Sequence, residues 1–379
     1  MKDIIYFDNA ATTKPTEEIK AVLNEYLNNG WYNPSALYEP CAKVSLNMDK
    51  CRKTILSSIG GYDGEIVFTS GGTESNNIAV FNSYMPKKTN HYITSAYEHA
   101  AVYQAFNRLE NMGQEVSYVK PDKHGVIAEK DVVDKIKENT VLVSIMHVNN
   151  ETGAINDINK IASAVKAKNK DINFHSDGVQ GFLKTSYTID ENIDFYSISG
   201  HKIGALKGTG ALYVKKGIKP KSIMFGGGQE KRIRPGTENT LGIEVFEKAI
   251  KAFNKDYNKI FGLRNRLAER LCEMDDVVIN SPMAQGKFSP YILNASVIGV
   301  KGETLLHALE AKGMFIGIGS ACSSKSRTNR VHDALNLTAD RGESAIRISF
   351  CDENELAQVD MLLKTIKSEA QTLRIFKRR

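Results

Sequence analysis

The sequence predicts an α/β protein with a largely parallel sheet and a second, smaller α+β domain. Short apolar runs that suit buried strands recur up to about Leu241, and stretches with helical spacing separate them. Such continuous apolar runs indicate strands that are covered on both faces, as in parallel sheets. With 379 residues, the chain is long enough to bury more than one hydrophobic core.

Each expected strand of the first domain is a short apolar segment, and a helix from Ser75 to Tyr84 follows the first of them. These strands are residues 65–69, 91–94, 141–146, 172–175, 195–198 and 210–214. A long helical stretch from Gly242 to Met274 then leads to strands at 276–279, 294–298 and 344–350 and to a terminal helix. We expect the domain boundary to lie within the long helix.

The composition is that of an ordinary globular protein, with 41% hydrophobic and 25% charged residues. The net charge of +6, from 50 basic and 44 acidic residues, is too small to indicate a nucleic-acid-binding protein. The basic segment at 374–379 is either a solvated tail or a contact for an acidic partner or RNA.

Neither a membrane span nor an export signal is expected. No apolar run approaches the roughly 18 residues of a membrane span. The N-terminus leads directly into the strand-like Ile4–Phe7, so we expect a cytoplasmic protein. The five cysteines contain no CxxC pair, which suits reduced thiols and gives no metal-ligand set. Four of them have apolar or helix-like surroundings and are expected to be structural: Cys41, Cys51, Cys272 and Cys351.

Polar clusters follow the expected strands, where ligands bind in open α/β sheets. The segment Thr69–Asn77 contains two glycines and opens a helix. Glycines let the backbone approach a ligand, and the free N–H groups of a first helical turn favour an anion. This segment fits a phosphate site, although it matches neither GxxxxGK[ST] nor GxGxxG. The alternative is an ordinary capped helix.

Two further strand ends carry Asp177 and Lys202. A carboxylate at the floor of a cleft can hold a protonated ring nitrogen, as a pyridoxal cofactor requires, or it can be a helix cap. A lysine amine can form a Schiff base with an aldehyde, although most lysines are surface charges. The phosphate site, Asp177 and Lys202 lie about 105 and 25 residues apart and together fit one cofactor.

These residues and several further motifs resemble the fold-type I pyridoxal-phosphate enzymes, and specifically the cysteine desulfurases. The resemblance covers essentially the whole chain. Its motifs are Tyr6–Thr13, Asn33–Ser35, Thr69–Asn77, Glu98–His99, Asn149–Gly153, Asp177–Gln180, Ser199–Lys202, Arg234–Asn239 and Gly319–Ser324.

The resemblance implies a large domain of residues 14–255 with a mostly parallel seven-stranded sheet. It implies a small α+β domain of residues 1–13 and 256–379 that carries the catalytic cysteine. It also implies pyridoxal 5'-phosphate as the cofactor, L-cysteine as the substrate and a homodimer.

The site residues follow from the same resemblance. Lys202 would hold the cofactor and move protons, His99 would stack on the ring, and Asp177 would pair with the ring nitrogen. The remaining cofactor-binding positions would be Gly72, Thr73, Asn150, Ser199 and His201, with Gln180 on the phenolic oxygen and Thr237 reaching the phosphate from the other subunit. Arg347 would bind the substrate carboxylate, assisted by Asn33 and Asn150. Taken singly, His99 also fits a buried histidine, and Arg347 also fits a structural ion pair.

Cys322 decides which reaction the resemblance implies. Its segment, residues 317–330, is rich in Gly, Ser and charge, so we expect an exposed, mobile loop. Lys325 and Arg327 could stabilise a thiolate, whereas the alternative is an inert cysteine. With Lys202 and His99, Cys322 would be catalytic: it would take the sulfur of L-cysteine as a persulfide, releasing alanine, and pass it to an acceptor protein.

The Gly-Ser-Ala-Cys-Ser-Ser segment resembles the long-loop group that supplies iron–sulfur cluster assembly and tRNA thiolation. The expected acceptor is therefore an iron–sulfur scaffold or a tRNA sulfurtransferase, with no membrane and no direct nucleic-acid partner. The chain departs from the family at Gly204–Leu206, where Gly-Pro is usual, and at Tyr38, where many members have His. The alternatives are a transaminase, a selenocysteine lyase and a non-catalytic scaffold.

Overall fold

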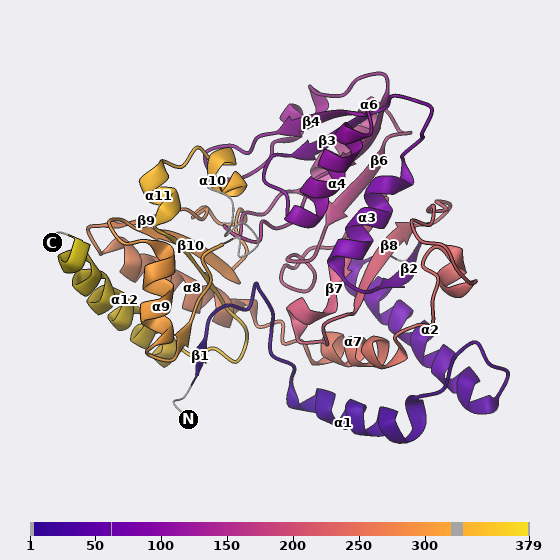
Figure 1. Ribbon diagram of the computed structural model, residues 1–379, viewed down its shortest axis with the longest axis horizontal. Helices are drawn as coiled ribbons and strands as arrows, with labels where there is room; N and C mark the ends of the chain where they lie inside the picture. Colours follow the sequence, from indigo (N-terminus) through magenta and orange to yellow (C-terminus); the bar gives the residue numbers. More distant parts are fainter. Residues whose placement is uncertain (1–3, 62, 320–328, 378–379) are drawn as a thin grey trace.

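Two lobes make up the molecule (Figure 1). The computed structural model describes residues 4–61, 63–319 and 329–377. The larger lobe contains a sheet of seven described strands in the order β2-β8-β7-β6-β5-β3-β4. These strands are β2 (Gly64–Thr69), β3 (His91–Ser95), β4 (Glu115–Val119), β5 (Thr140–Ser144), β6 (Asn173–Asp177), β7 (Phe195–Ser199) and β8 (Gly210–Lys215).

The sheet is mostly parallel, as the sequence predicts. Only β8 runs against its neighbours β2 and β7, and the other described pairs are parallel. The edge strand β4 was not expected from the sequence. Its residues alternate in polarity, with Glu115 exposed and Val119 buried, so it lacks the continuous apolar run that marks a strand covered on both faces.

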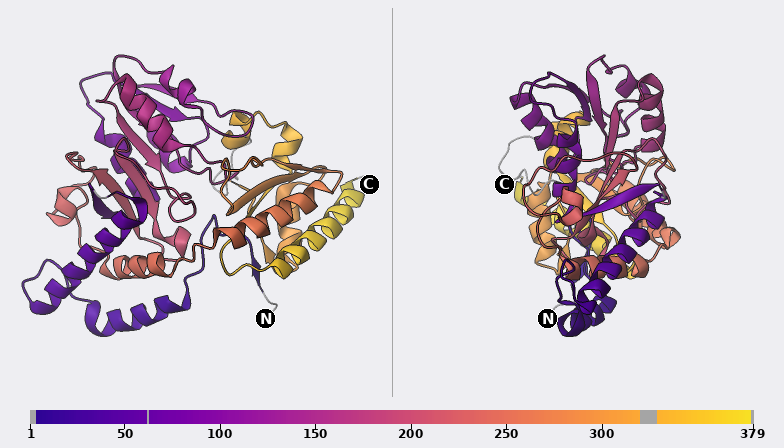
Figure 2. Two further views of the ribbon diagram at one scale, coloured as in Figure 1. Left: turned by 180° about the vertical axis from the view of Figure 1, so that it is seen from behind. Right: turned by 90° about the vertical axis from the view of Figure 1, so that its right-hand side faces the viewer.

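Helices cover both faces of this sheet (Figure 2). On one face α3 (Gly72–Asn82) and α4 (Ala100–Asn111) pack against the strands, for example through Phe106 against Tyr92. On the other face lie α2 (Glu39–Ile59), α6 (Ile158–Lys168) and α7 (Thr240–Ala252). Burial on both faces explains the apolar strands. The shorter elements of this lobe are α1 (Glu17–Glu25), the π-helix η1 (Tyr26–Gly30), α5 (Glu129–Val133) and the 3-10 turns η2 (Gly200–Ile203) and η3 (Gln229–Arg232).

The smaller lobe has a hydrophobic core of its own. Its antiparallel sheet has the order β12-β10-β9, and the N-terminal strand β1 pairs in parallel with β11. The strands are β1 (Ile5–Tyr6), β9 (Val277–Ile279), β10 (Ile292–Val297), β11 (Met314–Phe315) and β12 (Ala345–Ser349). The helices are α8 (Tyr257–Cys272), α9 (Gly302–Glu310), α11 (Ala339–Glu343) and α12 (Leu356–Lys377). The short helix α10 (Arg330–Ala334) packs through Val331 and Ala334 into the core of the large lobe.

The long helix expected from Gly242 to Met274 is wrong, because the chain forms two helices there. Phe253 leaves the helical conformation with ψ 114°, and Asp256 starts α8 by accepting a hydrogen bond from the Lys259 amide at 2.9 Å. The first helix contributes to the core of the large lobe and the second to the core of the small lobe. We therefore propose the domain boundary at residues 255–256. Within the described part of the chain, no helix combines the length and the apolar character needed to cross a membrane.

The cysteines differ in exposure. Cys41 and Cys51 are buried in α2 and fit the expected structural role, while Cys351 is half-buried. Cys272, expected in an apolar environment, is exposed at the end of α8. Its neighbour Leu271 is the residue that faces the core, so the apolar residues around Cys272 do not bury the thiol itself.

Candidate active site

A cavity of about 650 Å³ lies at the carboxyl ends of β6 and β7 and extends to β12 of the small lobe. Its volume suits a small organic cofactor together with a substrate. Ten of the predicted site residues line it: Gly72, Thr73, His99, Asn150, Asp177, Gln180, Ser199, His201, Lys202 and Arg347. The cavity thus brings together residues that are up to 275 positions apart between Gly72 and Arg347.

The first turn of α3 lies at the cavity wall, where its N–H groups can bind an anion. Gly72 opens this helix, and a Cβ atom there would lie 2.6 Å from Val179 Cγ2, so only glycine lets the backbone come this close. The unpaired N–H groups of a first helical turn attract a phosphate. Thr73, Ser199 and His201 line the same cavity and can add hydrogen bonds, so the residues present fit the phosphate of the expected cofactor.

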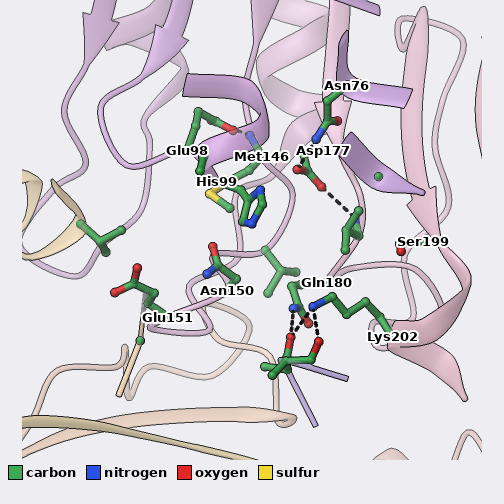
Figure 3. Close-up of a pocket in the computed structure, with 18 of the residues that line it drawn as sticks. Asn76, Glu98, His99, Met146, Asn150, Glu151, Asp177, Gln180, Ser199 and Lys202 are labelled. Atoms are coloured by element: carbon green, nitrogen blue, oxygen red, sulfur yellow. Dashed lines mark hydrogen bonds between the residues drawn. The ribbon is translucent and has the colours of Figure 1, made fainter. Parts of the chain in front are cut away.

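Asp177 ends β6 and is buried, with 4% of its surface exposed. Its Oδ2 accepts a hydrogen bond from Asn76 Nδ2 at 2.7 Å, and its Oδ1 accepts one from the Val179 amide at 3.0 Å. These contacts fix the orientation of the carboxylate at the cavity (Figure 3). A buried carboxylate requires a cationic partner or several donors, and the protonated ring nitrogen of pyridoxal phosphate would be such a partner.

Lys202 reaches the cavity from η2, which directly follows β7. Its Nζ donates hydrogen bonds to the carbonyl oxygens of Ala10 and Ala11, both at 2.7 Å. Gln180 Nε2 donates to the same Ala10 oxygen at 2.8 Å. Figure 3 shows the lysine and the amide converging on this short N-terminal segment. The Lys202 amine, which is predicted to bind the cofactor aldehyde, is therefore held at the cavity by Ala10 and Ala11 of the N-terminal segment.

Loss of solvation favours the uncharged forms of two neighbouring side chains at the cavity, the exposed His99 that lines it and the buried Glu98. His99 Nδ1 accepts a hydrogen bond from the Ala101 amide at 3.1 Å, so the neutral ring carries its proton on Nε2. Burial is the main cause that lowers the pKa of His99. Burial also raises the pKa of the neighbouring Glu98 to about 8. Near pH 7 both groups are neutral and can hydrogen-bond without adding charge to the cavity.

Arg347 extends from β12 of the small lobe and is 5% exposed. Its Nη2 pairs with Asp8 Oδ1 at 2.8 Å, and its Nη1 donates to the Asn150 carbonyl oxygen at 2.9 Å. Its Nε is buried and has no partner within the described residues. Since a buried donor without a partner is costly, this guanidinium fits a ligand carboxylate in the cavity.

Two predicted site residues that the structure describes, Asn33 and Thr237, do not line the cavity. Asn33 is exposed, and its Oδ1 accepts a hydrogen bond from the Ser35 amide at 2.9 Å, so the structure does not bring it to Arg347 in its own chain. Thr237 is also exposed, and its expected role in the other subunit stays a prediction. Cys322 lies outside the described residues.

The sequence assigned no role to three residues of this cavity: Asn76, Glu98 and Glu151. Asn76 lies about one turn after Thr73 on the same helix, and that spacing could have placed it at Asp177. Glu98 belongs to the sequence motif Glu98–His99, but that motif assigns a role only to His99. Burial raises the pKa of Glu151, and its Oε2 accepts a hydrogen bond from Asn329 at 3.1 Å. The sequence around these two acids gives no sign that they are buried.

A family model described as aminotransferase class-V matches residues 5–362. The chain belongs to the aminotransferase class-V family. Cysteine desulfurase IscS of Clostridium botulinum (strain Hall) is 34% identical over 375 residues, which cover 97% of this chain and 94% of that protein. Cysteine desulfurase IscS of Methanosarcina thermophila is 35% identical over 380 residues, covering 98% and 93%.

Solved structures agree with this assignment. A structure titled NIFS-like protein superposes with a TM-score of 0.88 at 30% identity and covers 98% of this chain and all of its own. A structure titled SspA in complex with cysteine has a TM-score of 0.81 at 29% identity and covers 93% of this chain and 99% of its own. The comparisons confirm the predicted resemblance to cysteine desulfurases, the fold class and pyridoxal phosphate as the cofactor of this class-V family enzyme.

Proposed function

We propose that this class-V family enzyme is a cysteine desulfurase that removes the sulfur of L-cysteine, releases alanine and delivers the sulfur to an acceptor protein. The observation that carries the proposal is the convergence of Lys202, Asp177 and Arg347 on one cavity in a chain 34% identical to a cysteine desulfurase. The cysteine-bound SspA structure among its neighbours further supports L-cysteine as the substrate.

Each of these residues has a defined task. When bound, pyridoxal phosphate supplies an electron sink that eases bond breaking at the substrate's Cα and Cβ atoms. Asp177 would hold the protonated ring nitrogen, and Arg347, which lines the same cavity, would bind the substrate carboxylate. Lys202 Nζ, with its flexible stem, takes the proton from Cα and returns it. His99, which lines the cavity, would cover the ring of the bound cofactor.

Cys322 would complete the reaction. Its thiolate attacks the sulfur of the bound cysteine, so that a new S–S bond forms while the Cβ–S bond breaks. The electron pair of the broken bond stays with the carbon fragment, which takes up a proton and leaves as alanine. A thiol on the acceptor protein then attacks the terminal sulfur of the persulfide and regenerates the Cys322 thiolate. The acceptor is an iron–sulfur scaffold or a tRNA sulfurtransferase, and a cytoplasmic location stays a prediction.

A homodimer fits this proposal. Several large apolar side chains are exposed on the large lobe, where a second copy could bury them. They are Leu27 at 71%, Trp31 at 60%, Leu37 at 103% and Phe225 at 97% exposed. Thr237 is exposed and does not line the cavity of its own chain, as a residue that serves the other subunit would be. In a dimer, the second copy would cover these apolar residues, and Thr237 would reach the phosphate site of that second copy.

The first test measures alanine and sulfide production from L-cysteine with a reductant present. The wild type should form both products in equal amounts. The Cys322→Ala variant should lose at least 99% of this activity while keeping the cofactor's absorbance, because only the sulfur acceptor is removed. Cys272→Ala is the matched control, since this thiol is exposed but lies outside the cavity. It should retain full activity.

Four results would overturn the proposal in different ways. Full activity of the Cys322→Ala variant would remove the persulfide step. A protein that shows the cofactor's absorbance but converts L-cysteine only when a keto acid is added would be a transaminase. A protein that releases selenium from selenocysteine but no sulfide from cysteine would be a selenocysteine lyase. A colourless protein that binds no pyridoxal phosphate would be the scaffold.

A further inference from the structure

Lys184 is a lysine side chain enclosed by the protein. It lies in the turn segment that follows β6 and is 2% exposed. Its Nζ donates to Gln180 Oε1 at 3.4 Å and lies 5.8 Å from the centre of the Tyr291 ring. The ion pairs between described residues do not include it, whereas the half-buried Lys166 pairs with Asp194 Oδ2 at 2.5 Å. A buried ammonium without a carboxylate is costly, so this side chain calls for an explanation.

A chain of hydrogen bonds connects Lys184 with Lys202. Lys184 donates to the oxygen of the Gln180 amide, and the nitrogen of that amide donates to the Ala10 carbonyl oxygen at 2.8 Å. The same oxygen accepts from Lys202 Nζ at 2.7 Å. A lysine ammonium can only donate and a carbonyl oxygen can only accept, so the two ends together fix the orientation of the Gln180 amide.

A second cavity, of about 30 Å³, is lined by both lysines. It has room for about one or two water molecules. Several titratable or charged groups face Lys184 or share this cavity: Lys14, Lys202, Tyr291, Arg347, Cys351, Asp352 and Glu353. Burial, followed by the neighbouring Lys202, lowers the pKa of Lys184 to about 7, and Arg347 acts in the same direction.

We propose that Lys184 is a positioning residue that disfavours a proton on Lys202 and holds the Gln180 amide toward Ala10. Two like charges in a buried region repel each other, so an ammonium at Lys184 favours the free amine at Lys202. The Ala10 and Ala11 carbonyl oxygens act the other way, because they stabilise an ammonium. A lysine must lose its proton before it can attack an aldehyde. This inference rests on the proposed function, because it assumes that Lys202 is the residue that binds pyridoxal phosphate.

The test follows the covalent attachment of pyridoxal phosphate to the apoprotein by absorbance between pH 5.5 and 9.5. This measurement reports the free-amine fraction of Lys202 and requires no cysteine. In Lys184→Met, the pH midpoint of the attachment rate should rise by about one unit, and the rate at pH 6.5 should fall about tenfold. Lys184→Arg keeps the charge and should retain the wild-type midpoint or lower it.

Lys14→Met is the matched control, because Lys14 lines the same small cavity but is 72% exposed. Its midpoint should equal that of the wild type. A folded Lys184→Met protein with an unchanged midpoint would overturn the inference, as would an equal upward shift in Lys184→Arg. If Lys184→Met does not fold, Lys184→Gln replaces it as the uncharged variant. Loss of sulfide production with normal attachment would instead contradict the proposed function alone.

Discussion

Glu98 shows how a single residue gains its chemical character from contacts on neighbouring strands. Its Oε1 accepts hydrogen bonds from Ser95 Oγ at 2.6 Å and from the Met146 amide at 2.9 Å. Its Oε2 is buried and has no partner among the described residues. Because burial raises the pKa to about 8, Oε2 carries a proton near neutral pH, and the side chain resembles a glutamine in shape and charge.

We therefore expect Glu98→Gln to fold as well as the wild type at pH 5, since glutamine can keep both accepted hydrogen bonds. The folded-state pKa of Glu98 lies above its unfolded value of about 4.3, so the folded protein binds the extra proton between these values. The wild type should lose stability relative to the variant as the pH rises from 4.5 to 8, by up to about 1.4 kcal/mol per pH unit. Urea unfolding at several pH values measures this difference, and parallel curves for the two proteins would show that Glu98 is ionised in the folded state.

At the scale of the elements, the N-terminus of α3 determines how closely a phosphate can approach the sheet. The preceding Gly71 packs against β8, where a Cβ at Gly210 would lie 2.5 Å from Gly71 Cα. Gly72 in turn lies against Val179, which follows Asp177 by two residues. The helix that would hold the phosphate is thus in direct contact with the segment after β6, whose Asp177 would hold the ring. The spacing between these two elements therefore sets the spacing between the two binding sites.

Gly72→Ala tests this contact. The added Cβ would lie 2.6 Å from Val179 Cγ2, so either Val179 or the helix must move. We expect the affinity of the apoprotein for pyridoxal phosphate to fall at least tenfold, as measured by equilibrium titration of absorbance. Gly262→Ala is the control: this glycine lies inside α8 with open space around its Cα. Alanine there should leave the affinity unchanged and stabilise the helix by up to about 1 kcal/mol. An unchanged affinity in Gly72→Ala would mean that the phosphate binds elsewhere.

At the scale of the whole molecule, buried histidines make stability depend on pH. His175 bridges Ser144 Oγ at 2.7 Å and Ser197 Oγ at 3.0 Å within the sheet. His147 contacts Tyr196 on another part of the same sheet. Burial lowers the pKa of each histidine to about 3. Since the unfolded value is about 6.5, the unfolded chain binds more protons between pH 6.5 and 3, and stability falls as the pH falls through this window.

Together, the two histidines can lower the free energy of unfolding by about 2.7 kcal/mol for each pH unit of acidification. The raised pKa of Glu98 has the opposite effect, by about 1.4 kcal/mol per pH unit. Burial also lowers the pKa of His201 and of His332 to about 4, so these groups act in the same direction, and we expect the free energy of unfolding to decrease between pH 6 and 4.5. His175→Gln should reduce this slope, whereas His124→Gln, at an exposed position, should not. The prediction is checked by urea titrations across this range, and equal slopes in all three proteins would contradict it.

The features that could be predicted from the sequence are those that depend on neighbouring residues. Apolar runs that end in Gly, Ser or Asp marked the strand ends, and the shared edge of a parallel sheet brought Asp177 and Lys202 together. The polar edge strand β4 has no such run, and the separation of α7 from α8 rests on a single helix cap. The contact of Arg347 with Asp8 spans 339 positions, and no local pattern encodes such a pairing.

The N-terminal segment has a consequence for how the protein is made. Residues Ala10 and Ala11 hold Lys202, while β1 before them pairs only with β11 among the described strands, at residues 314–315. On the ribosome, the first dozen residues must therefore wait until most of the chain has been synthesised before they reach their final position. The cofactor cavity is then among the last parts of the molecule to be completed, and cofactor capture becomes a late event in biogenesis.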